Sequence, residues 1–129
     1  MSANLQTPIK RARGLGSAKD GTHHFIVQRI TALALIPLSI WVVWLALALM
    51  HADFAQARAI LHHPFAAVWL AAFVIAAFWH AQLGMQVVIE DYVHGGAKTL
   101  SLILSTFAHT LIAAASIFAV LKVAFGSAT

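Results

Sequence analysis

The chain contains no cysteine and few charged residues. Without cysteine, its 129 residues can form no disulfide, no thiolate metal site and no cysteine-ligated cluster of their own. Only 9% of the residues are charged and 61% are hydrophobic, whereas soluble globular proteins have about 25% charged and about 45–50% apolar residues. The composition therefore predicts a small, single-domain integral membrane protein, in which any redox centre must use other ligands.

Three stretches without Asp, Glu, Lys or Arg are long enough to cross a bilayer. They cover residues 30–50, 64–89 and 99–121, and the shortest reaches across a hydrocarbon core of about 30 Å at about 1.5 Å per residue. We expect an all-α membrane protein with three transmembrane helices.

The rest of the chain divides around these spans. Residues 26–125 would form the membrane domain, between an N-terminal tail of residues 1–25 and a C-terminal tail of residues 126–129. Residues 51–63 and 90–98 are the expected polar connections. Pro37 is expected to kink the first helix.

The basic residues indicate how the chain is oriented. They gather near the N-terminus instead of forming an interleaved nucleic-acid-binding surface, so no nucleic-acid partner is expected. With the N-terminus in the cytoplasm, six of them lie inside and two outside, namely Lys10, Arg11, Arg13, Lys19, Arg29 and Lys98 against Arg58 and Lys122. The positive-inside rule thus predicts a cytoplasmic N-terminus and a C-terminus on the opposite side.

Two histidines, His80 and His109, fall inside the predicted spans, where ionisable side chains are rare and usually meet a partner, a cavity or a cofactor. At about 100° per residue, His80 shares one helix face with mostly small neighbours. The residues on this face are Phe73, Ala76, Ala77, His80, Gly84, Val87 and Asp91. Small side chains allow either close helix packing or space for a flat cofactor.

The role of His80 therefore stays open at this point. It could bond to another helix as part of a purely structural anchor, or it could ligate a haem iron. His80 lies nine residues before the end of its predicted span and His109 lies ten residues after the start of the next. Antiparallel spans would hold the two at similar depth, so a self-contained cytochrome with both ligands in this chain is conceivable.

The segment Glu90-Asp91-Tyr92 ends the same helix, roughly 16–18 Å from His80 by helical rise. A phenol beside a carboxylate can donate a hydrogen bond to a quinone carbonyl and relay a proton. Tyrosine is also common at membrane interfaces as a simple anchor. The pair is a candidate quinone contact.

A further motif, with His23 and Arg29, precedes the first span. Arg29 could be a positive-inside arginine that reaches the headgroups. Alternatively it could pair with a haem propionate or a quinone oxygen.

The segment from His80 through Gly84 to Asp91-Tyr92-Val93-His94-Gly95 closely resembles the signature of the hydrophobic membrane-anchor subunit of succinate dehydrogenase, respiratory complex II. The spacing of twelve residues from His80 to Tyr92 fits the family, as does the glycine four residues after the histidine. The histidine six residues before Arg29 matches as well. The resemblance covers roughly residues 14–125.

The resemblance implies an anchor subunit of succinate:ubiquinone oxidoreductase in a bacterial inner membrane, with a periplasmic C-terminus and no complete active site of its own. The chain would form half of a heterodimeric membrane-anchor bundle. His80 would supply one axial ligand to the iron of a b-type haem, and the companion cytochrome b subunit would supply the second. Tyr92 and Asp91 would contact ubiquinone near the iron–sulfur subunit. His23 and Arg29 would approach the haem propionates, and His109 would be a packing residue. The flavoprotein subunit would complete the enzyme of electron transport and the tricarboxylic acid cycle.

Overall fold

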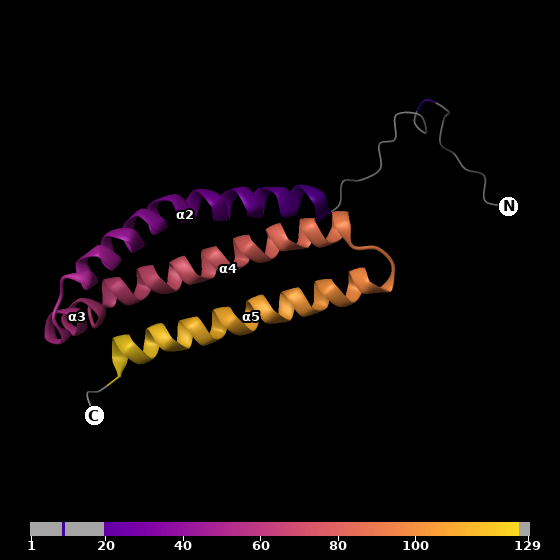
Figure 1. Cartoon of the computed structure of the whole chain (residues 1–129). Helices are drawn as coiled ribbons and strands as arrows, with labels where there is room; N and C mark the ends of the chain where they lie inside the picture. Colours follow the sequence, from indigo (N-terminus) through magenta and orange to yellow (C-terminus); the bar gives the residue numbers. More distant parts are fainter. Residues whose placement is uncertain (1–8, 10–19, 127–129) are drawn as a thin grey trace.

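The computed structural model describes residue 9 and residues 20–126, and it is helical almost throughout (Figure 1). Its helices are α2 (Asp20–Met50), α3 (Phe54–Leu61), α4 (Pro64–Tyr92) and α5 (Gly96–Phe125). No strand occurs in this part of the chain, so the all-α prediction is confirmed. Most of the predicted N-terminal tail, including Lys10, Arg11, Arg13 and Lys19, lies outside the described residues, as do residues 127–129.

Three of the helices are long and apolar enough to cross a membrane, as the sequence predicts. These segments are Gly21–Met50, Pro64–Tyr92 and Gly96–Phe125, of 30, 29 and 30 residues. Each is longer than the predicted span, because polar residues at the ends continue the helix into the headgroup region. A helix of about 30 residues measures about 45 Å, whereas the hydrocarbon core needs only about 30 Å.

The connection predicted over residues 51–63 contains the short helix α3. Asp53 forms a capping box at its start: Asp53 Oδ1 accepts from the Gln56 amide at 2.8 Å, and Gln56 Oε1 accepts from the Asp53 amide at 3.2 Å. These bonds satisfy backbone donors that have no partner within the helix. Directly after α3, His63 caps α4 and Pro64 occupies its first turn.

The turn between α4 and α5 is shorter than the predicted loop of residues 90–98. The two helices are separated by residues 93–95 only. Gly95 has a φ of 66°, a left-handed conformation that favours glycine. Lys98 already lies in α5, and its Nζ donates to the backbone oxygen of Glu90 at 3.1 Å, which ties the two helix ends together.

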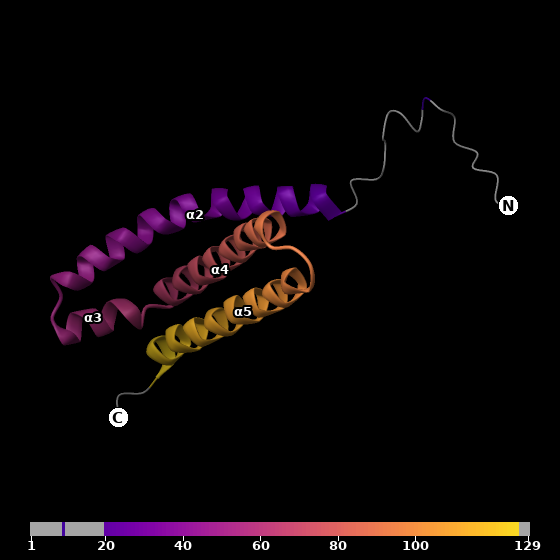
Figure 2. The ribbon, with the colours of Figure 1, turned by 45° about the vertical axis from the view of Figure 1, so that its right-hand side comes forward.

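Helix α4 lies between α2 and α5 and packs against both (Figures 1 and 2). Figure 2 shows α2 bending toward α3 in its second half, in the part of the helix that contains Pro37. Proline has no amide hydrogen, so it opens the backbone ladder there and accounts for the bend. The expected kink is thus present.

An aromatic cluster of Trp41, Phe65 and Trp69 holds α2 against α4 near α3. The Trp41 ring centroid lies 6.0 Å from that of Phe65 and 5.7 Å from that of Trp69, and Phe65 and Trp69 are 5.2 Å apart. Aromatic pairs at such separations add about 0.5–1.5 kcal/mol beyond their buried area.

Few side chains of the described part are buried, and most of these are small. The buried apolar residues are Leu45, Ala66, Ala67, Ala76, Leu83, Ile89 and Ala124. Many large apolar residues remain exposed on all three long helices. Because lipid tails or neighbouring transmembrane helices can cover such surfaces, they are compatible with a membrane-embedded chain.

Ala76 is 9% exposed and lies on the small-residue face of α4, so a larger side chain there should separate the helices. We predict that Ala76→Leu destabilises the protein by about 1–3 kcal/mol through overpacking. The exposed Ala81 on the same helix supplies the matched control, and Ala81→Leu should be nearly neutral. Thermal unfolding of the protein in detergent, followed by tryptophan fluorescence, measures both. Equal midpoints for the two variants would contradict this packing.

Candidate functional site

His80 lies in the middle of α4 and bonds to α2. Its Nδ1 is 3.0 Å from Thr31 Oγ1. The same hydroxyl lies 2.9 Å from the backbone oxygen of Val27 and 3.0 Å from that of Gln28. Thr31 is 7% exposed, the one buried polar residue of the described chain. The membrane histidine is therefore partnered, as its position within an apolar helix requires.

The other ring nitrogen of His80 remains open. Within the described chain Nε2 makes no hydrogen bond, and it is not one of the two buried, unpartnered side-chain atoms. His80 is partly buried. Because an enclosed Nε2 without a hydrogen bond would be a third such atom, this nitrogen lies on the accessible surface of the chain. An imidazole with one nitrogen hydrogen-bonded and the other accessible is the usual arrangement of a metal-ligating histidine.

Gly84 sits one turn beyond His80 and faces the Gln28 side chain. A Cβ built on Gly84 would meet only the Gln28 Nε2 atom within 4 Å, at 3.8 Å. Ala76, one turn before His80, is buried. The small-residue face of α4 thus lies against α2 at the level of His80 and Gly84.

Two buried polar atoms on α2 have no partner among the described residues. They are His24 Nε2 and Gln28 Oε1. His24, Gln28 and Thr31 follow one another at intervals of four and three residues, so they share one face of α2. Because buried polar atoms are nearly always hydrogen-bonded, this end of the α2–α4 interface calls for a bridging water or another group.

Arg29 and His23 do not join this interface. Both are exposed, and the guanidinium carbon of Arg29 lies 4.7 Å from the centroid of the Phe25 ring. Two residues along a helix correspond to a rotation of about 200°, so Arg29 points nearly opposite to Thr31. Within this chain the structure does not bring His23 or Arg29 to His80.

Asp91 and Tyr92 lie at the end of α4 on the surface. Tyr92 is 80% exposed and Asp91 is exposed as well. Their neighbour Glu90 is engaged within the chain, since its Oε1 accepts a hydrogen bond from Gln86 Nε2 at 2.9 Å. The phenol and the carboxylate are thus both accessible, about 18 Å from His80 by helical rise.

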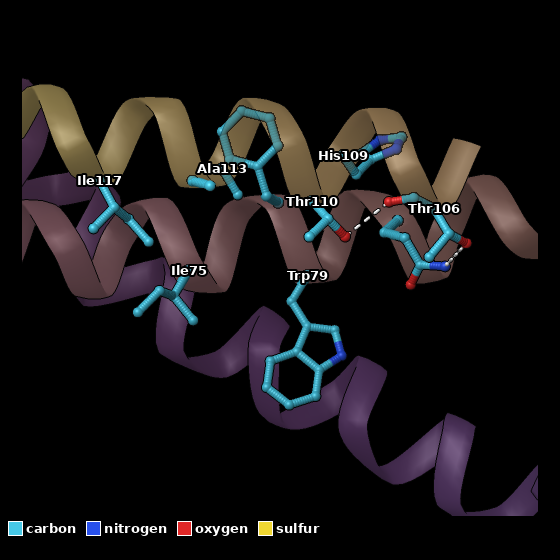
Figure 3. A pocket seen from close by; sticks show the side chains of 10 residues that line it. Ile75, Trp79, Thr106, His109, Thr110, Ala113 and Ile117 are labelled. Atoms are coloured by element: carbon cyan, nitrogen blue, oxygen red, sulfur yellow. Dashed lines mark hydrogen bonds between the residues drawn. The ribbon is translucent and has the colours of Figure 1, made fainter. Parts of the chain in front are cut away.

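His109 lies on α5 and uses a different side of α4. Its Nδ1 is 2.8 Å from the backbone oxygen of Ser105, and its ring meets Phe78 edge-on with centroids 6.5 Å apart. His109 lines a groove of about 420 Å³ between α4 and α5, and Trp79 lines it as well (Figure 3). Phe78 and His80 are about 200° apart on their helix, so His80 and His109 face different neighbours.

Thr31 and Gln28 were not among the site residues predicted from the sequence. A signal was present, because polar residues at positions 24, 28 and 31 repeat with helical spacing on an otherwise apolar segment. It identifies a face of α2 but not its partner. Only the structure shows that this face meets His80 and Gly84.

Three membrane-length helices and a polar site inside the bundle define a multi-pass membrane protein. A family model described as succinate dehydrogenase/fumarate reductase transmembrane subunit matches residues 3–121. The chain belongs to this family.

Relatives of the chain carry one description, "succinate dehydrogenase hydrophobic membrane anchor subunit". The protein of Rickettsia bellii (strain RML369-C) is 36% identical over 123 residues, which cover 95% of this chain and 91% of the relative. The protein of Paracoccus denitrificans is 35% identical over 124 residues, 94% of each chain. The family predicted from the sequence is therefore confirmed. No solved structure matches the chain significantly.

The α2–α4 contact can be tested by cross-linking, since the natural chain has no cysteine to interfere. We predict that cysteines at positions 28 and 84 are bridged by a short bis-methanethiosulfonate reagent, because the Gln28 side chain lies over Gly84. In the control pair, Arg29→Cys replaces Gln28→Cys and turns the thiol by about 100°. Intact mass distinguishes one bridging linker from two singly attached ones. Equal bridging in both pairs would contradict the interface.

Proposed function

We propose that this chain is the hydrophobic membrane-anchor subunit of a succinate:ubiquinone oxidoreductase in a bacterial inner membrane. Its role is to dock the flavoprotein and iron–sulfur subunits to the bilayer, next to the cytochrome b subunit. The description of its relatives and the three membrane-length helices support this role. Because the chain has no cysteine, thiolate-ligated iron–sulfur chemistry belongs to other subunits.

His80 would be the residue of this chain that holds the iron of a b-type haem. The observation that carries the proposal is the state of its ring, with Nδ1 3.0 Å from Thr31 Oγ1 and Nε2 on the accessible surface. Imidazole nitrogen is a common axial ligand of haem iron, so the residues present fit half of such a site. When bound, the haem supplies one-electron transfer. His80 would hold the iron, and Thr31 would hold the His80 ring in place.

The second ligand comes from the cytochrome b subunit. His109 bonds Ser105 and packs on Phe78, whereas His80 bonds to α2. Since these contacts lie on different sides of α4, the two rings are not turned toward a common position beside this helix. This geometry favours a shared haem over a self-contained cytochrome.

His23 and Arg29 approach the haem propionates from the first turns of α2. Their exposure leaves both side chains available to a group held between this chain and its partner. The guanidinium of Arg29 can bind a carboxylate through two parallel hydrogen bonds. The contact of the guanidinium with the Phe25 ring holds the Arg29 side chain near the N-terminal end of α2.

Tyr92 and Asp91 form part of the ubiquinone site at the membrane surface. The Tyr92 hydroxyl donates a hydrogen bond to a quinone carbonyl oxygen, and its 80% exposure leaves room for that contact. Asp91 is the adjacent group that takes up and passes on a proton. Reduction of a quinone to a quinol consumes two electrons and two protons, and Asp91 can deliver protons to the quinone at this position.

This surface lies on the cytoplasmic side of the membrane. The first turn of α2, the end of α4 and the start of α5 are at the same end of the bundle (Figure 1). The six Lys and Arg assigned to the inside belong to this end or to the tail that precedes it. The positive-inside rule therefore puts Tyr92 next to the soluble subunits and the C-terminus in the periplasm.

His80→Ala should remove the haem. We predict that the purified complex of this variant lacks the reduced b-type absorption band, while His109→Ala retains it because His109 serves packing. Co-purification of the anchor with the other subunits shows that each complex is assembled. A full band in the His80 variant would refute the assignment, and a lost band in the His109 variant would indicate a second ligand from this chain.

Tyr92→Phe should slow quinone reduction specifically. The change removes one hydroxyl and keeps the ring, so we expect quinone reductase activity to fall about tenfold or more, as loss of a strong hydrogen bond predicts. Succinate oxidation by a soluble artificial acceptor in the same preparation should be unchanged, because it bypasses the membrane site. Unaltered quinone turnover would leave Tyr92 as an interfacial anchor only.

A further inference from the structure

We propose that Thr31 is the positioning residue of the haem ligand: its hydroxyl accepts the Nδ1–H of His80, which fixes the tautomer and the orientation of the imidazole and presents Nε2 to the iron. The inference rests on the proposed ligation of haem by His80. It assigns to Thr31, on α2, the role of positioning the ligand, whereas His80 binds the iron.

The direction of the bond follows from counting protons. Thr31 Oγ1 lies 2.9 Å and 3.0 Å from two backbone oxygens, those of Val27 and Gln28. Carbonyl oxygens only accept hydrogen bonds, and a hydroxyl has a single proton to donate. If that proton pointed at His80 instead, both short oxygen–oxygen contacts would lack a hydrogen. The Thr31 hydroxyl therefore donates to the backbone of its own helix.

The hydroxyl can then only accept from His80. The Nδ1 of His80, 3.0 Å from Thr31 Oγ1, must carry the proton of this bond. A neutral imidazole has one proton, so its Nε2 keeps a lone pair. That lone pair is what a metal ion requires of a histidine ligand.

The surroundings of Thr31 keep the arrangement rigid. The residue is 7% exposed, so little water can compete for the hydroxyl. Its β-branched side chain has few rotamers in a helix, and the bond to a carbonyl one turn earlier selects among them. Thr31 is thus a fixed acceptor against which the ring of His80 is aligned.

The bond should also tune the haem. An acceptor on Nδ1–H makes the opposite nitrogen more basic, and such outer partners typically contribute about 10- to 100-fold to metal affinity. A more basic ligand stabilises ferric iron over ferrous iron. Removal of the hydroxyl should therefore weaken haem binding and move the haem midpoint potential to more positive values.

The test compares variants of the purified complete complex. Thr31→Val keeps the shape and removes the hydroxyl, Thr31→Ala removes it without any risk of overpacking, and Thr31→Ser keeps it. Thr110→Val is the matched control, because Thr110 makes the same backbone bond on α5, 2.8 Å to the oxygen of Thr106, without a histidine partner. The readouts are haem per complex, the rate of haem transfer to apomyoglobin and the midpoint potential by redox titration.

We expect Thr31→Val and Thr31→Ala to release haem about tenfold faster and to have a more positive midpoint potential. Thr31→Ser and Thr110→Val should match the natural complex. If Thr31→Val does not assemble, the Ala and Ser variants decide the question by the same readouts. Equal haem behaviour in the hydroxyl-free variants and in Thr31→Ser would overturn the proposal.

A parallel His80→Ala complex separates this inference from the proposed function. If His80→Ala keeps its haem, the ligand assignment falls, and the role of Thr31 falls with it. If His80→Ala loses haem while the Thr31 variants keep the natural midpoint potential and release rate, only the role of Thr31 is refuted.

Discussion

The hydrogen bond between His80 and Thr31 is the interaction on which the site depends. An imidazole inside an apolar bundle needs a partner, because an unsatisfied polar group in hydrocarbon is strongly unfavourable. Thr31 provides that partner from the neighbouring helix, at 3.0 Å, and its own proton is used by the backbone of α2. One contact therefore satisfies a membrane histidine, joins two spans and leaves a nitrogen lone pair free to bind.

Helix α4 supports the rest of the arrangement. One side packs on α2 through small residues such as Ala76 and Gly84, and another side meets α5 near His109. Its end carries Asp91 and Tyr92 at the surface, about 18 Å from His80 by helical rise. Helix α4 thus holds His80, in the middle of its span, at a fixed distance from Asp91 and Tyr92 at the end of the helix. The exposed apolar surface around the helices leaves room for the companion subunit that the proposed haem site requires.

The sequence predicted the helices and the family but not the contact at their centre. Apolar runs without charges are a direct signal for spans. The segment from His80 to Gly95, combined with the spacing of His23 and Arg29 and the three spans, predicted the family that the family model confirms. The ends of the long helices and the short helix α3 were harder to predict, because polar residues can continue a helix as readily as they end one. Thr31 was missed because a threonine in an apolar helix gives no sign of which neighbour it meets. The burial of His24 Nε2 and Gln28 Oε1 likewise appears only once α2 and α4 are packed.

In the proposed function this chain carries half of a haem site, and the identity of the atoms bound to the iron decides whether that proposal is right. A cryo-electron microscopy map of the complete complex tests this most directly. We predict His80 Nε2 on one side of the iron, Thr31 Oγ1 within hydrogen-bond distance of His80 Nδ1, and a ligand from the companion anchor subunit on the other side. Ligation by both His80 and His109, or an iron that His80 does not touch, would contradict the account.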